Sequence, residues 1–219
     1  MDPRYFGHER REVAPFLPGR DLRILEIGCG AAATMAWLRG EGYCRWAGGV
    51  ERDASAAAVA KGRLDRLWVG DIETLDFDLA PRSVDVILCL DVLEHLIDPW
   101  AVVARLGGLL ADGGAIIASI PNIRYRKVVL PLLLRGRFDY ADDGILDRTH
   151  LRFFVRETAI ALMQSGSLAV DRIEPLVKLK PWRLPWIVDK MTAGRLIDLM
   201  AMQYLIRARP AGELRSPSS

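Results

Sequence analysis

The sequence predicts an α/β protein with a doubly wound, mostly parallel sheet of seven strands. Three observations predict this fold class. Short apolar runs alternate with helix-forming segments, glycine or proline marks the junctions, and acidic residues follow the apolar runs. Because strands that alternate with helices need parallel crossovers, the runs are expected to be neighbouring buried strands. The alternation stops at Pro121, which predicts a helical insertion over the sheet and then an antiparallel strand at one edge of the sheet.

The first half of the chain supplies five apolar runs of strand length. They cover residues 22–27, 44–50, 67–69, 84–90 and 115–120. The first run ends at Gly28 and Gly30, and the helix formers at 31–39 follow until Gly40, which ends a helix because glycine accepts a positive φ. The sheet is therefore expected to begin with a strand, a glycine turn and a helix.

Two further helices are expected between the later strands. Asp53 is expected to cap an alanine-rich helix, because its carboxylate can accept hydrogen bonds from the first backbone N–H groups. Asp98 followed by Pro99 opens the next helix, since proline is favoured at the first helical position. The glycines at 113–114 are expected to close that helix, and Pro121 to end the fifth strand.

The second half is expected to add an insertion and the last strands. The elements are a helix over 123–137, a loop over 138–151, a helix over 156–164, and strands over 168–173 and 203–208 that the segment 178–200 separates. We interpret residues 1–219 as one domain. Its parts are an N-terminal arm or lid (1–20), a donor-binding core (21–120), a substrate-covering insertion (121–167), C-terminal strands (168–210) and a frayed tail (211–219).

Composition excludes several classes of protein. The 219 residues include 30 Lys and Arg against 28 Asp and Glu, and 51% are hydrophobic, as in a globular domain. The longest apolar run, residues 128–134, is far shorter than the roughly 20 residues that span a bilayer. A net charge of +2 without a nucleic-acid motif argues against nucleic acid. Cys29, Cys44 and Cys89 lack CxxC spacing, so we expect buried thiols, no metal site and a cytoplasmic protein.

Acidic residues and glycines gather where the predicted strands end. Gly28 and Gly30 follow the first strand, Glu51 the second, Asp71 the third and Asp91 the fourth. The carboxyl ends of parallel strands are the edge where such sheets bind ligands, and an acid after the second strand can accept hydrogen bonds from a ribose. Each residue alone also fits a tight turn, a helix cap or a solvated loop. The set together predicts a nucleotide-like ligand.

These residues resemble a known family, the class I S-adenosylmethionine-dependent methyltransferases, and within it the small-molecule group that includes ubiquinone-pathway O-methyltransferases. The resemblance is carried by LEIGCGAA at 25–32, Val50 with Glu51, Gly70 with Asp71, DVLEHLIDP at 91–99 and SIPN at 119–122. It implies a Rossmann-like methyltransferase fold, S-adenosylmethionine as cofactor and S-adenosylhomocysteine as product. The donor-binding residues that it implies are Glu26, Gly28, Cys29 and Gly30 around the methionine part, Glu51 and Arg52 at the ribose, Asp71 and Ile72 at the adenine, and Asp91 at the substrate-facing edge.

One departure and two rival interpretations accompany the resemblance. The family commonly has a third glycine where this chain has Ala32. An NAD(P)-dependent oxidoreductase would share the fold, but it gives no reason for Glu26 inside the first strand or for the Gly70–Asp71 pair, and no Tyr-xxx-Lys hydride-transfer motif occurs. A non-catalytic methyltransferase-like module that regulates a partner stays an alternative.

The candidate catalytic residues come from two short stretches. His150 is the candidate general base, and Asp147 is expected to orient its ring. His95, in DVLEHL, is the second candidate. A structural role is the alternative for all three. We expect a small-molecule acceptor, methylated on a hydroxyl of a natural-product, sugar or lipid-linked precursor, with nitrogen or carbon as alternative acceptor atoms.

Basic and aromatic residues suggest what the acceptor carries. The segment 124–137 has five basic residues and no acid, and Trp182 and Trp186 lie among further lysines. An anionic acceptor and a lipid-linked acceptor at a membrane surface both fit, as does a merely solvated face. Tyr5 and Phe6 suit a lid over the cavity, which Arg10, Tyr125 and Tyr140 are candidates to line.

Overall fold

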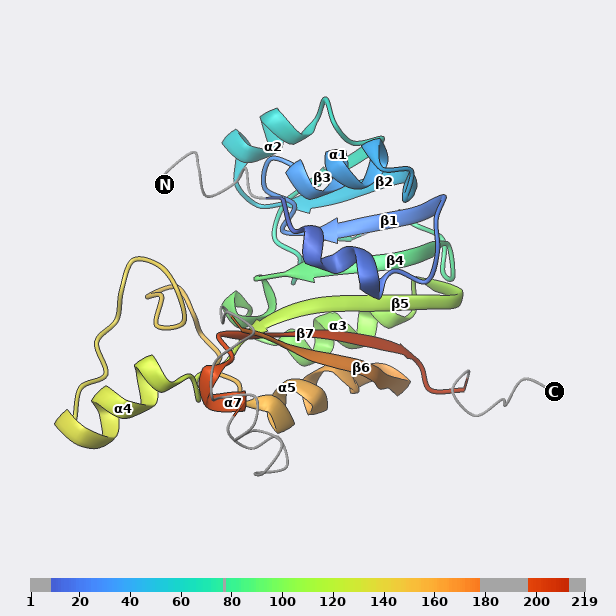
Figure 1. The fold of residues 1–219 in the computed structure, drawn as a ribbon. Helices are drawn as coiled ribbons and strands as arrows, with labels where there is room; N and C mark the ends of the chain where they lie inside the picture. The colour runs from blue at the N-terminus through green and yellow to red at the C-terminus, as the bar shows by residue number, and fades with distance from the viewer. Residues whose placement is uncertain (1–8, 77, 178–196, 213–219) are drawn as a thin grey trace.

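The structure is a computed structural model that describes residues 9–76, 78–177 and 197–212 (Figure 1). Several expectations fall outside these ranges. The proposed lid residues Tyr5 and Phe6, the Trp182 and Trp186 region and the end of the expected frayed tail all lie there. Within the described residues, no helix has the length and apolar character needed to cross a membrane.

The fold class is confirmed, because one sheet of seven strands forms the centre of the molecule in the order β3-β2-β1-β4-β5-β7-β6. The strands are β1 (Leu22–Ile27), β2 (Cys44–Glu51), β3 (Arg66–Val69), β4 (Val84–Leu90), β5 (Leu110–Pro121), β6 (Leu168–Leu176) and β7 (Gln203–Pro210). Strands β1 to β5 are parallel, and β7 runs antiparallel to both β5 and β6. The antiparallel strand therefore lies between β5 and the edge strand β6.

Helices cover both faces of the sheet, as doubly wound folds require. They are the 3₁₀ segments η2 (Arg11–Phe16), η3 (Leu93–His95) and η4 (Ser165–Ser167) and the α-helices α1 (Ala33–Gly40), α2 (Ala54–Ala60), α3 (Pro99–Gly107), α4 (Arg126–Arg135), α5 (Arg156–Met163) and α7 (Ile197–Met200). Adjacent strand residues point to opposite faces. Leu25 packs in the cluster that contains α3 and α5 side chains, and Ile24 in the cluster that contains η2 and α1 side chains.

The helix caps were predicted correctly, but the end of α3 was not. The carboxylates of Asp53 and Asp98 accept hydrogen bonds from the first turns of α2 and α3. Helix α3 already ends at Gly107, and β5 begins at Leu110 rather than at residue 115. Gly114 lies inside β5, next to a register irregularity with β4, where an added Cβ would lie 2.8 Å from the Ala111 carbonyl oxygen. The glycines at 113–114 thus let the strand bend and do not close the helix.

The insertion after β5 has a helix and a long loop. Helix α4 begins at Arg126, because Asn122 first closes a turn in which its side-chain oxygen accepts a hydrogen bond from the N–H of Arg124. In Figure 1, α4 projects away from the sheet and the chain after it returns toward the carboxyl ends of the strands. The loop of the insertion therefore lies nearest to the functional edge.

Ala32, the residue in place of the family's third glycine, has a left-handed backbone with φ 56° and ψ 37° at the start of α1. This conformation costs an L-residue about 1 kcal/mol that glycine does not pay. We expect Ala32→Gly to leave the free energy of unfolding unchanged or to raise it by up to about 1 kcal/mol, measured by urea denaturation. The control Ala36→Gly, at an exposed position inside α1, should lower it by about 0.5–1 kcal/mol. An equal loss in both variants would contradict the prediction.

Candidate active site

The turn between β1 and α1 is held close to β2. Gly28 and Gly30 have φ values of 67° and 53°, in the left-handed region that glycine favours. The N–H groups of Gly28 and Cys29 donate to the carbonyl of Val50 at 2.8 and 3.0 Å. A Cβ at Gly28 would lie 3.1 Å from Cγ2 of Val92, a tight contact to which the Val92 side chain would have to yield. A ligand at this turn would meet bare backbone.

Two carboxylates lie at the ends of β2 and β3, beside this turn. Glu51 is 7% exposed, and its oxygens accept hydrogen bonds from the N–H groups of Gly30 at 2.7 Å and Asp53 at 2.8 Å. A carboxylate has about four lone-pair positions, so acceptor capacity for two ribose hydroxyls is left. Asp71 accepts from the N–H of Glu73 at 2.9 Å, and Ile72 beside it is buried. Arg52 is exposed at the end of β2.

Glu26 is a buried acid beneath the same turn. It is 4% exposed, and its Oε2 has no hydrogen-bond partner among the described residues. Burial raises the pKa of Glu26 to about 8, against the opposing charge of Arg10 and with a smaller contribution from Glu51. An ionised Glu26 needs a cation nearby, so the position fits a ligand with a positively charged group.

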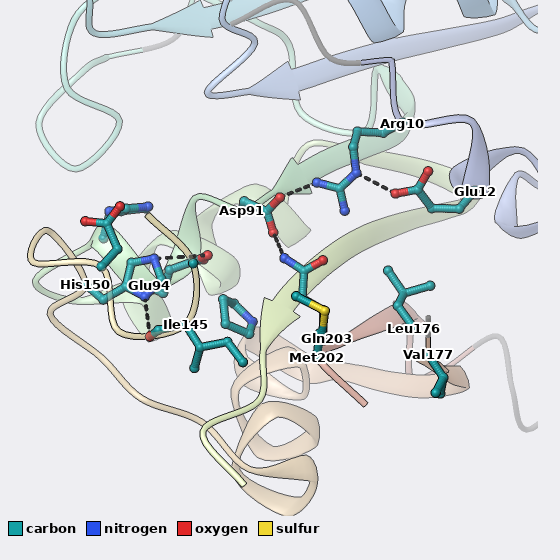
Figure 2. A pocket seen from close by; sticks show the side chains of 14 residues that line it. Arg10, Glu12, Asp91, Glu94, Ile145, His150, Leu176, Val177, Met202 and Gln203 are labelled. Atoms are coloured by element: carbon teal, nitrogen blue, oxygen red, sulfur yellow. Dashed lines mark hydrogen bonds and ion pairs between the residues drawn. The ribbon is translucent and has the colours of Figure 1, made fainter. Parts of the chain in front are cut away.

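A cavity of about 460 Å³ opens near the carboxyl ends of β4 and β5 (Figure 2). Its lining comes from the N-terminal segment, the turn after β4, the loop of the insertion and the ends of β6 and β7. The lining residues are Arg10, Glu12, Asp91, Glu94, His95, Pro121, Gly144, Ile145, Asp147, His150, Leu176, Val177, Met202 and Gln203. None comes from α4, and neither Tyr125 nor Tyr140 takes part.

Asp91 joins three walls of this cavity. Its carboxylate forms an ion pair with the guanidinium of Arg10 and accepts hydrogen bonds from Ser119 Oγ at 2.7 Å and from the side-chain amide of Gln203. Arg10 is also paired with Glu12 (Figure 2). Segments from both ends of the chain are thus fixed beside the end of β4.

The hydrogen bonds around His95 define its neutral form. The hydroxyl of Thr149 donates to Asp147 Oδ1 at 2.6 Å, so its oxygen faces His95 Nδ1, 3.0 Å away, as an acceptor. Nδ1 lies 3.2 Å from the carbonyl oxygen of Thr149 as well. Nδ1 is therefore the protonated nitrogen, and Nε2 keeps a lone pair. Burial and the adjacent His150 lower the pKa of His95, which also favours the neutral ring.

His150 has other partners than the sequence suggested. We expected Asp147 to orient its ring, but both hydrogen bonds to Asp147 Oδ1 come from the N–H and hydroxyl of Thr149, because the turn at 147–150 folds the carboxylate back onto its own backbone. His150 Nδ1 instead lies 3.0 Å from the carbonyl oxygen of Ile145. Asp147 thus supports His95 through Thr149.

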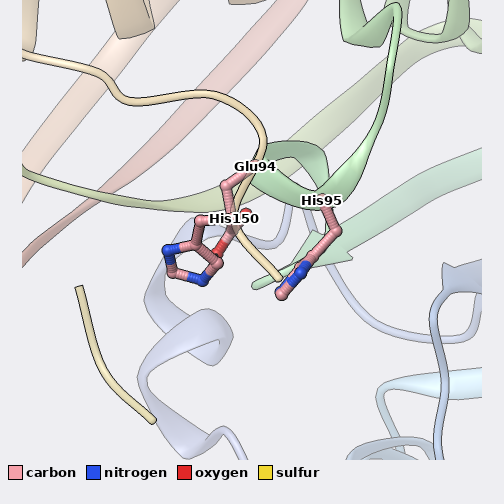
Figure 3. Close-up of side chains that lie close together, drawn as sticks. All are labelled: Glu94, His95 and His150. Carbon is pink, nitrogen blue, oxygen red and sulfur yellow. The ribbon is translucent and has the colours of Figure 1, made fainter. Parts of the chain in front are cut away.

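Glu94 is the residue of this site that the sequence reasoning missed. It is 1% exposed, and neither carboxylate oxygen has a hydrogen-bond partner among the residues that the structure describes. Its Oε1 lies 3.9 Å from His150 Nε2 (Figure 3). Burial and, after it, the charge of Asp91 raise the pKa of Glu94 well above its usual range. The sequence did contain a signal for its burial, because Glu94 lies in a stretch with the apolar residues Leu93 and Leu96. Both leucines are buried in the structure, as Glu94 is.

The expected site residues thus occupy two regions. His95, Asp147, His150 and Asp91 line the cavity. Glu26, Gly28, Gly30, Glu51, Asp71 and Ile72 lie at the glycine turn and the neighbouring strand ends, outside its lining. Cys29 is buried in the turn, and its thiol is free, like those of Cys44 and Cys89. The predicted buried thiols are confirmed.

Comparison with known proteins identifies the family. A family model described as a methyltransferase domain matches residues 2–170. A ubiquinone biosynthesis O-methyltransferase of Thiobacillus denitrificans is 29% identical over 137 residues, which cover 54% of this chain and 56% of the relative. The corresponding protein of Burkholderia pseudomallei is 26% identical over 191 residues, or 74% of this chain and 72% of the relative. The chain thus spans only a little over half of the first relative.

Solved structures agree on the fold. The crystal structure of an S-adenosylmethionine-dependent methyltransferase from Mesorhizobium loti superimposes with a TM-score of 0.65 at 18% identity, covering 90% of this chain and 95% of that one. The family model covers well over half of the sequence. This chain belongs to the class I S-adenosylmethionine-dependent methyltransferase family.

Proposed function

We propose that this chain transfers the methyl group of S-adenosylmethionine to a hydroxyl oxygen of a small molecule bound in the 460 Å³ cavity. The observation that carries the proposal is the position of Glu94, His95 and His150 in that cavity. Glu94 and His95 follow β4 and the glycine turn follows β1, so both lie at the carboxyl edge of the parallel strands. Oxygen as the acceptor atom is further supported by the printed names of the relatives, which are O-methyltransferases.

The residues at the glycine turn fit the donor. Glu51 would accept hydrogen bonds from the ribose hydroxyls, Asp71 and Ile72 would meet the adenine, and Glu26 would face the charged methionine part. The buried, unpartnered Oε2 of Glu26 is the observation that tests this fit, since an anion at that place needs a cationic ligand. When bound, S-adenosylmethionine supplies a methyl group on a positively charged sulfur.

The cavity residues would act on the acceptor. Arg10 and Asp91 would position it, because their paired charges line the cavity. The rings of His95 and His150 each have Nδ1 against a backbone carbonyl, which leaves Nε2 to attract the hydroxyl and its proton. Ile145, Leu176 and Val177 form an apolar part of the lining and would limit the access of water to the reacting oxygen.

Calorimetry and labelling test the proposal. The purified protein should bind S-adenosylmethionine and S-adenosylhomocysteine, and incubation with labelled donor and fractionated cell extract should give a labelled small molecule that mass spectrometry identifies. Tight binding of NAD(P) with no binding of either sulfur compound would refute it. Labelled RNA or protein would refute the small-molecule acceptor, and binding without any transfer would favour the non-catalytic alternative.

The raised pKa of Glu26 predicts that donor binding releases a proton. With a pKa of about 8, Glu26 is mostly protonated at pH 7, whereas a bound cationic group favours its ionised form. Donor affinity should therefore rise with pH, by up to about tenfold between pH 6 and pH 7. Calorimetry in two buffers of different protonation enthalpy should count close to one proton released at pH 7. Glu26→Gln should abolish this release, and an unchanged proton count would contradict the assignment.

A further inference from the structure

We propose that Glu94, His95 and His150 bind a divalent transition-metal ion, with Zn²⁺ as the best-matched ion, and that this ion holds the acceptor hydroxyl. The proposal rests on the proposed function for the role of the ion, while the site itself rests on the three side chains. It replaces the sequence-based expectation of no metal site.

The three residues bring one donor atom each to a common point. The donor atoms lie within 4.8 Å of one another, and the two imidazole rings have centroids 4.6 Å apart in an edge-on arrangement (Figure 3). Around a tetrahedral ion with bonds of about 2.0–2.2 Å, donor atoms are roughly 3.4 Å apart. The separations between the donor atoms therefore need to contract by up to roughly 1.4 Å when an ion binds.

Both imidazoles are oriented as metal-binding histidines usually are. Such rings donate their second N–H to a carbonyl or carboxylate, which fixes the tautomer that carries the free lone pair. His150 Nδ1 faces the Ile145 carbonyl and His95 Nδ1 faces the Thr149 carbonyl. The chain from Asp147 through the Thr149 hydroxyl adds a carboxylate behind His95. The Nε2 atom of each ring is left as the ligand atom.

Glu94 supplies the second, independent sign of a ligand. A carboxylate that is 1% exposed and has no hydrogen-bond partner is costly to ionise, and no Arg or Lys is ion-paired with it among the described residues. Its backbone is fixed, because its carbonyl accepts from the N–H groups of Leu151 and Arg152, in the segment that carries His150. A divalent ion between Glu94 and the rings would satisfy these oxygens and the two lone pairs together.

The donor set indicates the kind of ion. Two imidazole nitrogens with one carboxylate suit Zn²⁺ and other first-row transition ions, whereas Mg²⁺ and Ca²⁺ prefer oxygen ligands. Three protein ligands leave a fourth position free, as in catalytic rather than structural zinc sites. All three residues line the cavity, so the free position faces the space assigned to the acceptor.

The ion would lower the pKa of the acceptor hydroxyl, as it does for bound water. The hydroxyl proton leaves to solvent, the oxygen forms a bond to the methyl carbon, and the carbon–sulfur bond of the donor breaks with its electron pair staying on sulfur. The positive charge of the sulfonium is thereby balanced by the released proton. His150 and His95 then act as ligands, and no general base among them is required.

Direct metal binding tests the site without any acceptor. Chelator-stripped native protein should bind one equivalent of Zn²⁺ by calorimetry, and Co²⁺ should give the visible absorption bands of a coordinated ion. Glu94→Gln, His95→Gln and His150→Gln should each weaken Zn²⁺ binding by about 100-fold or more and remove the bands. Glu157→Gln, which removes an exposed carboxylate on α5, should change neither. Equal Zn²⁺ affinity in the native protein and the three cluster variants would overturn the proposal.

Two further measurements keep the outcome clear. Thr149→Val, which cuts the link from Asp147 to His95 without removing a ligand, should weaken Zn²⁺ binding by about 10- to 100-fold, and an unchanged affinity would count against the geometry. Binding of S-adenosylmethionine to the metal-free protein is measured separately, so that failure of the metal site can be told from failure of the proposed methyltransferase function. Methyl transfer at the native rate by stripped protein overturns the metal site and leaves the proposed function standing. Zn²⁺ binding by a protein that binds no S-adenosylmethionine supports the site and refutes the function.

Discussion

The His150→Gln variant is expected to transfer methyl groups about 10²- to 10⁴-fold more slowly than the native protein, with donor affinity nearly unchanged. The position of the ring explains why the rate should fall while the donor affinity should not. The ring lies in the cavity proposed for the acceptor with Nε2 directed at Glu94, and none of its hydrogen bonds reaches the glycine turn. The kcat is measured with the acceptor that labelling identifies, and the donor Kd by calorimetry.

The matched control is Arg148→Gln, because Arg148 belongs to the same loop but pairs with Asp142 on the surface. We expect its kcat to stay within about twofold of the native value. A purely structural His150 would give a different pattern. The variant would then have a lower Tm and weaker binding of both donor and acceptor, while kcat at saturation stayed near the native value.

Replacing Glu51 with alanine is expected to weaken donor binding by about 1.5–3 kcal/mol, or roughly 10- to 150-fold in Kd. The carboxylate is buried and held by the N–H groups of Gly30 and Asp53, so its free lone pairs would serve the ribose without reorganisation. Calorimetry with S-adenosylhomocysteine measures the change without turnover.

Asp53→Asn is the control for this second prediction. Asp53 lies two residues away and caps α2, a role that asparagine fills equally well, so donor affinity should stay within about twofold. If Glu51→Ala and Asp53→Asn had the same small effect, the ribose would have to bind elsewhere, and the assignment of the whole turn would fail.

Local chemistry explains why the structure around the glycine turn was largely predictable. The αL glycine turn, the cap at Asp53 and the strand from Val84 to Leu90 each depend on residues that are neighbours in sequence. The prediction from the paired glycines failed, because long-range packing decides their role. The glycines at 113–114 predicted a helix end, but they permit β5 to bend where it pairs with β4. This pairing joins residues that are far apart in sequence, so no local pattern predicts it.

The acceptor side was less predictable, because its contacts join distant residues. His95, Asp147 and His150 were found from their chemistry, but the order of their hydrogen bonds, through Thr149 and Ile145, depends on how the loop folds back. The burial of Glu94 follows from the packing of the insertion against the turn after β4, where Leu151 and Arg152 bond to its carbonyl. Gln203 reaches Asp91 from the last strand, and nothing in its own sequence context indicates this.

The contacts of Asp91 have a consequence for how the molecule is made. The residues assigned to the donor lie between positions 26 and 72, whereas Asp91 is held by Arg10 near the start of the chain and by Gln203 near its end. Because a ribosome delivers the chain from the N-terminus, the segments assigned to the donor are complete in the nascent polypeptide long before Gln203 emerges. The ion pair between Arg10 and Asp91 therefore lacks the hydrogen bond from Gln203 until the start of β7 has been synthesised. A truncated translation product that ends before β7 therefore contains the segments assigned to the donor, but it lacks Gln203 and with it part of the cavity lining.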